Sequence, residues 1–282
     1  MFKCIYIFIF VSLFTYKEKI MKIAILYICT GKYNLFFKDF YTSCEKYLLK
    51  DVASKDYFVF TDEMQLCTYD NVHLIFKKCQ GFPADSLFRF EMFLSIKEQL
   101  EAFDYIYFFN SNAKFLQPVG KEILPNETNL VGAEWPVNRK PFNHPAFYPY
   151  EKNKKSLAYI SSNEKGPFIY YMGGVNGGTS KAYIKMIETL AFNIREDYKN
   201  GIIARVHDES HINRYFKNHP CKILPKEYCI PEELVTDNIQ PRMIFRNKIT
   251  FDLSFNKGRK TNLYLKCKRF LDKMICLLKW YL

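Results

Sequence analysis

The sequence predicts an α/β protein in which helices cover a parallel or mixed central sheet. Short apolar runs, typical of buried strands, alternate along the chain with segments of helical periodicity. Polar residues follow directly after several of these runs. The composition, 49% hydrophobic and 25% charged, excludes a disordered, collagenous or multi-span membrane protein. A length of 282 residues is enough for one large domain with a sizeable core.

Apolar and aromatic runs predict the strands of the first half, and Tyr105–Phe109 is the run most typical of a doubly covered central strand. Apolar residues recur at helical spacing between residues 36 and 50, and Pro83 begins a second helix that carries Arg89. The predicted strands of this half are 22–28, 57–60, 73–76 and 105–109.

In the second half, residues 168–172 predict a strand that ends at Gly173 and Gly174. Those glycines and the next pair, 177–178, are consistent with a turn that uses positive φ angles. The remaining predicted elements are a helix from 180 to about 199, a helix over 207–216 and a strand over 243–245.

Polar residues mark the ends of the predicted strands. Ligands of such sheets bind beyond the carboxyl ends of the strands, so these ends predict the site. They are 29–31, 60–62, 110–112 and 173–174.

The net charge of +12 is concentrated in the C-terminal segment 251–282, whose eight Lys or Arg and two Asp contribute half of it. The hypothesis that the whole protein is a nucleic-acid-binding module therefore loses half of its support. Within this tail, residues 262–281 have the pattern of a basic amphipathic helix. Such a helix binds an anionic membrane surface, and the alternative is that it packs on the protein itself.

The N-terminal segment 1–20 is interpreted as lying outside the core. Its apolar stretch is too short to span a bilayer and lacks a small-residue cleavage site. Met21 is therefore the expected natural start, and a weak anchor is the alternative. Nine scattered cysteines form no CxxC pair, which argues against a zinc ribbon and favours a reducing compartment, the cytoplasm.

The sharpest cluster of functional side chains is His207-Asp208-Glu209-Ser210-His211. Two histidines four residues apart share a helix face, so a zinc hydrolase using His207 and His211 is one hypothesis. The metalloprotease spacing, however, places Glu directly after the first His. The other interpretations are a helix-start cap and a catalytic carboxylate.

Several motifs, in the same order and spread from about residue 21 to 248, resemble family 6 glycosyltransferases. That family comprises the histo-blood-group A and B transferases and their bacterial relatives. The matching stretches are 207–213, 170–174 with 177–178, 25–33, 60–62, 89–92, 119–125, 158–160 and 246–248.

The resemblance implies a GT-A fold, Rossmann-like with a mixed central sheet, as a single catalytic domain over 21–250. It implies retaining α-1,3 transfer of N-acetylgalactosamine (GalNAc) or galactose from a UDP-sugar to a galactoside. Glu209 matches the carboxylate that faces the anomeric carbon. An anion there either attacks that carbon or stabilises an oxocarbenium-like centre, and the sequence does not choose between them.

Residues 110–112 differ from the mammalian Asp-x-Asp that binds Mn²⁺ and resemble the Asn-x-Asn of bacterial relatives. Neutral amides are poor ligands for a hard cation, so we expect no metal cofactor. The charge of the leaving diphosphate then needs protein cations. Lys248, with a catalytic role, and Arg246, as a donor-binding residue, match the segment that covers the diphosphate; a solvated basic turn is the alternative.

The family places Gly173 and Gly174 against the donor sugar. The missing Cβ of Gly174 favours GalNAc, whereas Met172 resembles galactose-using members. Trp135 is expected either to stack on an acceptor sugar or to lie in the core. By resemblance, the donor-binding residues are Ile28, Thr30, Tyr33, Phe60, Asp62, Arg89, Asn110, Ser111, Asn112, Met172, Gly173, Gly174, Asp208 and Arg246, and the acceptor-binding residues are Trp135, Val206, His207 and Glu232.

The expected partners are a nucleotide sugar and a galactose-terminated glycan or glycolipid of a surface polysaccharide, such as lipopolysaccharide or capsule. No nucleic acid is expected. The location that follows is the cytoplasm, with peripheral attachment through 262–281 to the inner face of the bacterial cytoplasmic membrane.

Overall fold

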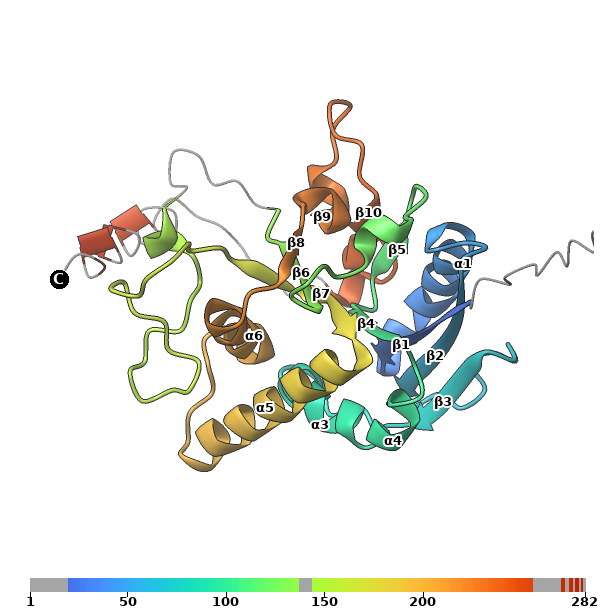
Figure 1. The fold of residues 1–282 in the computed structure, drawn as a ribbon, viewed down its shortest axis with the longest axis horizontal. Coiled ribbons are helices and arrows are strands. Elements are labelled where there is room, and N and C mark those ends of the chain that lie inside the picture. The colour runs from blue at the N-terminus through green and yellow to red at the C-terminus, as the bar shows by residue number, and fades with distance from the viewer. Residues whose placement is uncertain are drawn as a thin grey trace, which may run out of the picture.

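The computed structural model describes residues 20–136 and 144–255 and a few single residues between 270 and 280. Its centre is a seven-stranded sheet in the order β3-β2-β1-β4-β7-β6-β8 (Figure 1). A small second sheet has the order β5-β10-β9. The strands are β1 (Met21–Cys29), β2 (Ala53–Thr61), β3 (Val72–Phe76), β4 (Tyr105–Phe109), β5 (Ala113–Phe115), β6 (Leu130–Glu134), β7 (Tyr171–Thr179), β8 (Lys222–Leu224), β9 (Ile230–Pro231) and β10 (Met243–Phe245).

The main sheet is parallel on one side and largely antiparallel on the other, so the mixed sheet is confirmed. Strands β1 to β4 run parallel, with Ile25 opposite both Tyr57 and Tyr107. β7 pairs antiparallel with both β4 and β6. The antiparallel β7 therefore brings its first residues, beginning at Tyr171, to the edge where β1, β2 and β4 end.

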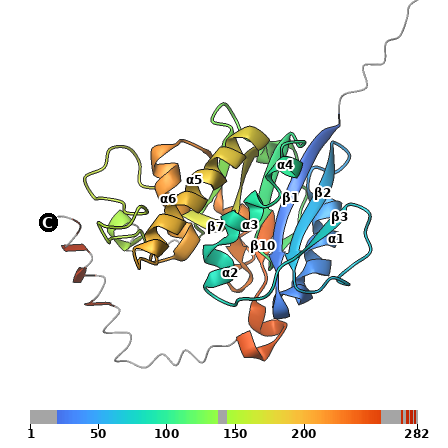
Figure 2. The same cartoon turned by 90° about the horizontal axis from the view of Figure 1, so that it is seen from below.

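Helices cover both faces of the sheet, which explains why β1 is apolar on both sides. Ile25 and Tyr27 pack with α1, whereas Leu26 packs with α3 and α5. Figure 1 shows α3, α4 and α5 below the sheet and α1, β5 and β10 above it, and Figure 2 shows the same layers from below. The helices are α1 (Phe37–Tyr47), α2 (Ala84–Leu87), α3 (Arg89–Leu94), α4 (Lys97–Leu100), α5 (Ser180–Lys199) and α6 (His207–Asn218).

Most of the predicted helices and strands are found, whereas β5, β6, β8 and β9 are strands that the sequence pattern did not predict. Two of the predicted elements need correction. The helix expected to begin at Pro83 is three short helices, because the backbone leaves helical geometry at Phe88 and at Ile96. The strand expected over 168–172 begins only at Tyr171 and continues to Thr179.

All four glycines of β7 therefore lie inside a strand, and the turn interpretation is wrong. None of them has a positive φ angle. A Cβ on Gly177 would lie 2.4 Å from Cδ1 of Tyr107, and one on Gly178 would lie 2.4 Å from the carbonyl oxygen of Asn129. These glycines are needed because neighbouring strands approach too closely for a side chain.

The proposed boundaries of the terminal segments fall largely on residues outside the described part of the chain, so they stay predictions. Most of the predicted helix 262–281 also lies there, apart from single residues such as Trp280. Trp280 is half-buried and contacts Phe168, with ring centroids 5.1 Å apart. Across the residues that are described, no helix combines the length and the apolar character needed to cross a bilayer.

Candidate functional site

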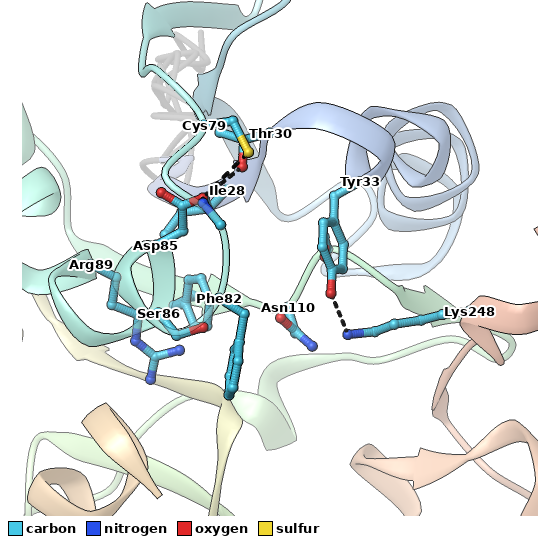
Figure 3. A pocket seen from close by; sticks show the side chains of 13 residues that line it. Ile28, Thr30, Tyr33, Cys79, Phe82, Asp85, Ser86, Arg89, Asn110 and Lys248 are labelled. Atoms are coloured by element: carbon cyan, nitrogen blue, oxygen red, sulfur yellow. Dashed lines mark hydrogen bonds between the residues drawn. The ribbon is translucent and has the colours of Figure 1, made fainter. Parts of the chain in front are cut away.

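A cavity of about 210 Å³ lies at the carboxyl ends of β1 and β4, as the strand ends predict. Figure 3 shows Tyr33 and Lys248 on one side, Arg89 and Phe82 on the other, and Asn110 between them. Seven residues assigned by resemblance to donor binding or leaving-group catalysis line it: Ile28, Thr30, Tyr33, Arg89, Asn110, Ser111 and Lys248. The other lining residues are Cys79, Gly81, Phe82, Asp85, Ser86 and Phe108.

Two aspartates hold the loops at one end of this cavity. Asp62 accepts hydrogen bonds from the Gly31 N–H, at 2.8 Å, and from the Asn34 side chain. Burial works against ionisation of Asp62, but these hydrogen bonds lower its pKa overall. Asp85 accepts hydrogen bonds from the Thr30 hydroxyl and from the backbone N–H of Gly81. Asp62 therefore shapes the loop after β1 and does not itself line the cavity.

Lys248 lies across the cavity from Arg89. Its Nζ donates a hydrogen bond to the Tyr33 hydroxyl at 3.2 Å and lies 4.7 Å from the centre of that ring. No carboxylate within ion-pair distance of Lys248 is found among the described residues. Its ammonium group can therefore meet an anionic ligand.

Arg246 lies outside the lining and is already paired. Its guanidinium donates to Asp39, at 2.6 Å, and to Glu232, at 3.0 Å, and it stacks on Phe251. Glu232, assigned by resemblance to acceptor binding, also accepts the backbone N–H of Asn247. The structure thus places Arg246 and Glu232 together, where two carboxylates neutralise the arginine.

The two asparagines at the positions of the mammalian metal-binding carboxylates are bonded to each other and to the residue that follows β10. The Asn110 amide donates to Oδ1 of Asn112 at 2.8 Å, and the Asn112 amide donates to the carbonyl of Arg246 at 2.7 Å. The described residues contain no group of three or more His, Cys, Asp or Glu side chains arranged for a metal ion. This donor set does not fit Mn²⁺, which prefers carboxylate oxygens.

Glu209 lies in the first turn of α6, next to the start of β7. Its Oε1 accepts the Tyr170 hydroxyl at 2.6 Å, and its Oε2 accepts the Gly173 N–H at 2.7 Å. Burial raises the pKa of Glu209, while these two donors oppose the rise. Both carboxylate oxygens are therefore held in a fixed orientation.

Arg89 and Asp208 form a buried ion pair that joins Glu209 to the cavity. Nη2 of Arg89 lies 2.7 Å from Oδ2 of Asp208 and 2.8 Å from the carbonyl oxygen of Gly173. Burial raises the pKa of Asp208, and Arg89 partly compensates. Nε of Arg89 is buried and has no hydrogen-bond partner among the described residues. This pair places the Arg89 guanidinium in the lining of the cavity, with its charge balanced by Asp208 at the α6 N-terminus.

Asn213 fastens α6 to β7. Its amide accepts from the Tyr171 N–H at 2.8 Å and donates to the Tyr171 carbonyl and to the Glu209 carbonyl, both at 2.9 Å. All of Asn213's polar groups are thus used in the interior. The clamp sets the position of Glu209 relative to Gly173.

Neighbouring side chains of the protein leave little room for a side chain at Gly173 or Gly174. A Cβ on Gly173 would lie 3.1 Å from Cβ of Glu209, and one on Gly174 would lie 2.9 Å from Cζ of Phe245. The space beside Gly174, expected to take an acetamido group, is occupied by Phe245 and by Asn110. The missing Cβ therefore does not by itself favour GalNAc.

Other residues assigned by resemblance are used in packing. The Phe60 ring is buried in the core against Phe93 and does not line the cavity, because its strand position points inward. Asn112 is buried, and Met172 packs against the same core as β1. Trp135 contacts Tyr170, with ring centroids 5.3 Å apart.

The histidines of the α6 motif do not gather metal ligands. His207 is half-buried, has a φ angle of +49° and contacts the exposed ring of Phe82. His211 is buried, and burial lowers its pKa to about 4, although Asp197 and Glu151 act in the opposite direction. Val206 precedes the helix, and its N–H donates to Ser210.

Sequence reasoning missed Tyr170, Asn213 and Phe82. The first two lie within the quoted motifs 170–174 and 207–213, so the signal was present, but their contacts with Glu209 and β7 are long-range. Phe82 lies in a loop with no such pattern.

Comparison with known proteins identifies the family of this chain. The model of glycosyltransferase family 6 matches residues 9–250. The chain is 34% identical over 230 residues to the O-antigen biosynthesis glycosyltransferase WbnI of Escherichia coli, covering 81% of this chain and 95% of WbnI. It is 32% identical to the globoside alpha-1,3-N-acetylgalactosaminyltransferase 1 of Gallus gallus, with 74% of this chain and 61% of that protein covered.

The histo-blood group ABO system transferase 1 of Rattus norvegicus is also 32% identical, with 78% of this chain and 64% of that protein covered. The chain thus spans nearly all of the bacterial relative and somewhat under two thirds of the two vertebrate ones. The mixed seven-stranded sheet is consistent with a GT-A fold. With a family model matched over most of its length, the chain is a glycosyltransferase that belongs to glycosyltransferase family 6.

Proposed function

We propose that this protein transfers GalNAc, or galactose, from a UDP-sugar to a galactoside through an α-1,3 linkage, with retention and without a metal ion. The observation that carries the proposal is the fixed carboxylate of Glu209 beside a cavity that a cation lines. The name of the chicken relative, an alpha-1,3-N-acetylgalactosaminyltransferase, supports GalNAc and the α-1,3 linkage.

In this proposal the UDP group occupies the cavity. Tyr33 offers an aromatic surface for the uracil ring. Asn110 and Thr30 offer hydrogen-bonding groups for the ribose and phosphates, and Lys248 offers a compact positive charge for the diphosphate.

The transferred sugar then lies between the diphosphate and Glu209. Bond breaking at the anomeric carbon develops positive charge there, which the Glu209 carboxylate stabilises or captures. Tyr170 and the Gly173 N–H keep that carboxylate oriented. Retention follows either from two successive inversions through Glu209 or from attack of the acceptor on the face that the UDP leaves.

The leaving group gains negative charge as the bond breaks. Preorganised cations stabilise such charge strongly in a site that excludes water. Lys248 stabilises this negative charge. The Arg89 guanidinium is a second cation beside it, although Asp208 balances its charge.

We also propose that the acceptor is a surface glycan or glycolipid ending in galactose. The bacterial relative, 34% identical, is named for O-antigen biosynthesis, and a basic C-terminal segment suits work beside an anionic membrane. The enzyme would then act at the inner surface of the cytoplasmic membrane.

The test is incubation with a panel of UDP-sugars, with and without a β-galactoside, followed by measurement of UDP release and NMR of the product. The proposal expects fastest UDP release with UDP-GalNAc or UDP-galactose and an α-configured 1,3-linked product. A β-configured product would overturn retention. Turnover restricted to another sugar nucleotide would overturn the donor assignment.

A further inference from the structure

A group of aromatic side chains packs apart from the two cores that flank the main sheet. Tyr150, Ile160 and Tyr170 are its buried centre. Trp135, Tyr148, Phe168 and Trp280 are half-buried around that centre. We call these seven residues the aromatic cluster.

The aromatic cluster is continuous with the catalytic carboxylate. Tyr170 donates its hydroxyl hydrogen bond to Glu209, and its ring contacts Trp135 and Tyr150 at centroid distances of 5.3 and 5.4 Å. From Tyr150 the contacts continue to Phe168, at 6.3 Å, and from there to Trp280, at 5.1 Å. The cluster therefore leads outward from the reacting centre by several ring widths.

Backbone and side-chain hydrogen bonds hold this cluster in place. The Trp135 N–H donates to the Tyr170 carbonyl at 2.9 Å, and the Tyr150 hydroxyl donates to the Ile169 carbonyl at 2.8 Å. The Lys217 ammonium lies 3.9 Å from the centre of the Phe168 ring and donates to the carbonyls of residues 165–167. A surface that is ordered before binding loses little entropy when a ligand arrives.

Trp280 reaches the cluster from outside the family match, which ends at residue 250. It contacts His144 as well as Phe168, and in Figure 1 the C-terminal residues lie beside the segment that begins at His144. Trp280 thus lies on the side of the molecule that carries the aromatic cluster. Trp280 is a feature of this chain that the shared catalytic domain does not supply.

We propose that the half-buried rings of the aromatic cluster form a distal acceptor subsite. It binds the sugar units of an oligosaccharide that lie beyond the galactose receiving the transferred sugar. The proposal rests on the proposed function and adds the substrate class: the acceptor is a chain of several sugars, not a monosaccharide or disaccharide. The C–H faces of pyranose rings pack against aromatic faces, while their hydroxyl groups stay in water or bond to polar groups.

Position argues for a glycan as the occupant. The path of rings starts at the hydrogen-bond partner of Glu209, where the acceptor must present its hydroxyl, and a linear glycan extends from that point. A membrane surface would instead contact Trp280 alone and leave Trp135, the half-buried ring beside Tyr170, unused. These two occupants give opposite results in the experiments below.

Intrinsic fluorescence tests binding without any turnover, because the only two tryptophans in the sequence, Trp135 and Trp280, both lie in the aromatic cluster. The full-length protein with UDP is titrated with β-methyl galactoside and with a tetrasaccharide ending in β-galactose. We expect a saturable change with the tetrasaccharide at concentrations where the monosaccharide gives none. Trp280→Phe should reduce the amplitude, and Phe168→Ala should weaken the apparent affinity. An identical response to both sugars would overturn the proposal.

Kinetics give the second measurement. Phe168→Ala and Trp280→Ala should raise the KM for the tetrasaccharide roughly three- to tenfold, the effect of one aromatic contact. The kcat, and the KM for the monosaccharide, should be unchanged. Phe192→Ala and Leu278→Ala remove exposed side chains outside the cluster and serve as matched controls.

UDP release, measured with each of the two acceptors, keeps the two proposals separate. If the wild type releases no UDP from any sugar nucleotide, the proposed function fails, whereas the fluorescence titration still tests the subsite. If Trp280→Ala lowers binding to phosphatidylglycerol vesicles and leaves tetrasaccharide binding and KM unchanged, the tail binds membranes and the distal subsite is wrong.

Discussion

At the scale of single residues, Glu209 combines burial with two hydrogen-bond donors. Burial alone would favour its protonated form, which cannot stabilise a cationic centre. The Tyr170 hydroxyl and the Gly173 N–H offset part of that penalty and orient both oxygens. The sequence motif pointed to this carboxylate, whereas the two donors that orient it were found only in the structure.

We therefore predict that Glu209→Gln lowers kcat by orders of magnitude and leaves the affinity for UDP nearly unchanged. The amide keeps the volume of the side chain but loses the charge. Steady-state kinetics and calorimetric UDP binding measure the two effects. Glu196→Gln, at the exposed end of α5, is the matched control. If Glu209→Gln retains more than about a tenth of kcat, a barrier change under ~1.4 kcal/mol, Glu209 has a structural role only.

The pH dependence follows from the raised pKa of Glu209. The ionised form is the active one, so activity falls as the pH drops through the raised pKa, at a higher pH than for an ordinary glutamate. Tyr170→Phe removes a donor that stabilises the anion, so it should move the acidic limb of the kcat profile to still higher pH. Tyr150→Phe, whose hydroxyl bonds to a carbonyl, should leave the limb in place. An unshifted limb in Tyr170→Phe would contradict this account.

Lys248 and Arg246 lie two residues apart but have different partners. Lys248 lines the cavity, whereas Arg246 is held by Asp39 and Glu232. We predict that Lys248→Ala lowers kcat much more than it raises the KM for the donor, and that added Mn²⁺ does not restore it. Arg246→Ala should be milder on kcat and should lower the melting temperature. Equal losses of kcat in both variants would contradict the division of roles.

At the scale of elements, the site forms where β1, β4, β7 and α6 meet. The antiparallel β7 delivers Gly173 to the edge where the parallel strands end, and Asn213 locks α6 onto that strand. Gly177 allows β7 to approach β4 closely, because a Cβ there would clash with Tyr107. The contacts between α6 and β7 therefore determine the position of Glu209.

Breaking these contacts should cost both stability and activity. Asn213→Leu leaves the N–H and carbonyl of Tyr171 buried without partners, which costs about 1–3 kcal/mol for each unsatisfied group. We expect a lower free energy of unfolding in urea together with a lower kcat, since Glu209 loses its alignment. Asn200→Leu, at the exposed C-terminus of α5, is the control and should change neither quantity much. Unchanged kcat in Asn213→Leu would show that the helix does not need this clamp.

At the scale of the whole molecule, the proposed function assigns the neutralisation of the leaving diphosphate to protein cations in place of a metal. The asparagines at the end of β4 are bonded to each other and to the backbone of Arg246, so they join β4 to β10. These hydrogen bonds are better suited to holding the ends of the two strands together than to binding a hard cation.

Activity should therefore persist in EDTA. We predict that UDP release and transfer in excess EDTA stay within about twofold of the untreated enzyme, because neutral amides bind Mn²⁺ too weakly for it to be required. Asn110→Asp with Asn112→Asp supplies a positive comparison, since restored carboxylates should introduce a response to Mn²⁺. Reversible loss of turnover on chelation of the wild type, restored by Mn²⁺, would refute metal independence.

The sequence by itself determined the fold class, most of the elements and the family. Strand and helix periodicities are local, so Tyr105–Phe109, Ser180–Lys199 and Met243–Phe245 could be placed from the chain alone. The motif 207–213 likewise contains both Glu209 and Asn213, which lie within the first two turns of α6. Much of the cavity lining could be predicted because parallel strands end at a common edge.

Only the tertiary structure decided where several of these side chains point and what they bond. Asp39 and Arg246 form an ion pair across 207 residues of sequence, and no local pattern contains it. The same holds for the Tyr170–Glu209 hydrogen bond and for the contact of Trp280 with Phe168. Periodicity specifies which face of an element is buried, whereas the partner of a polar or aromatic side chain depends on distant segments that meet only in the folded chain.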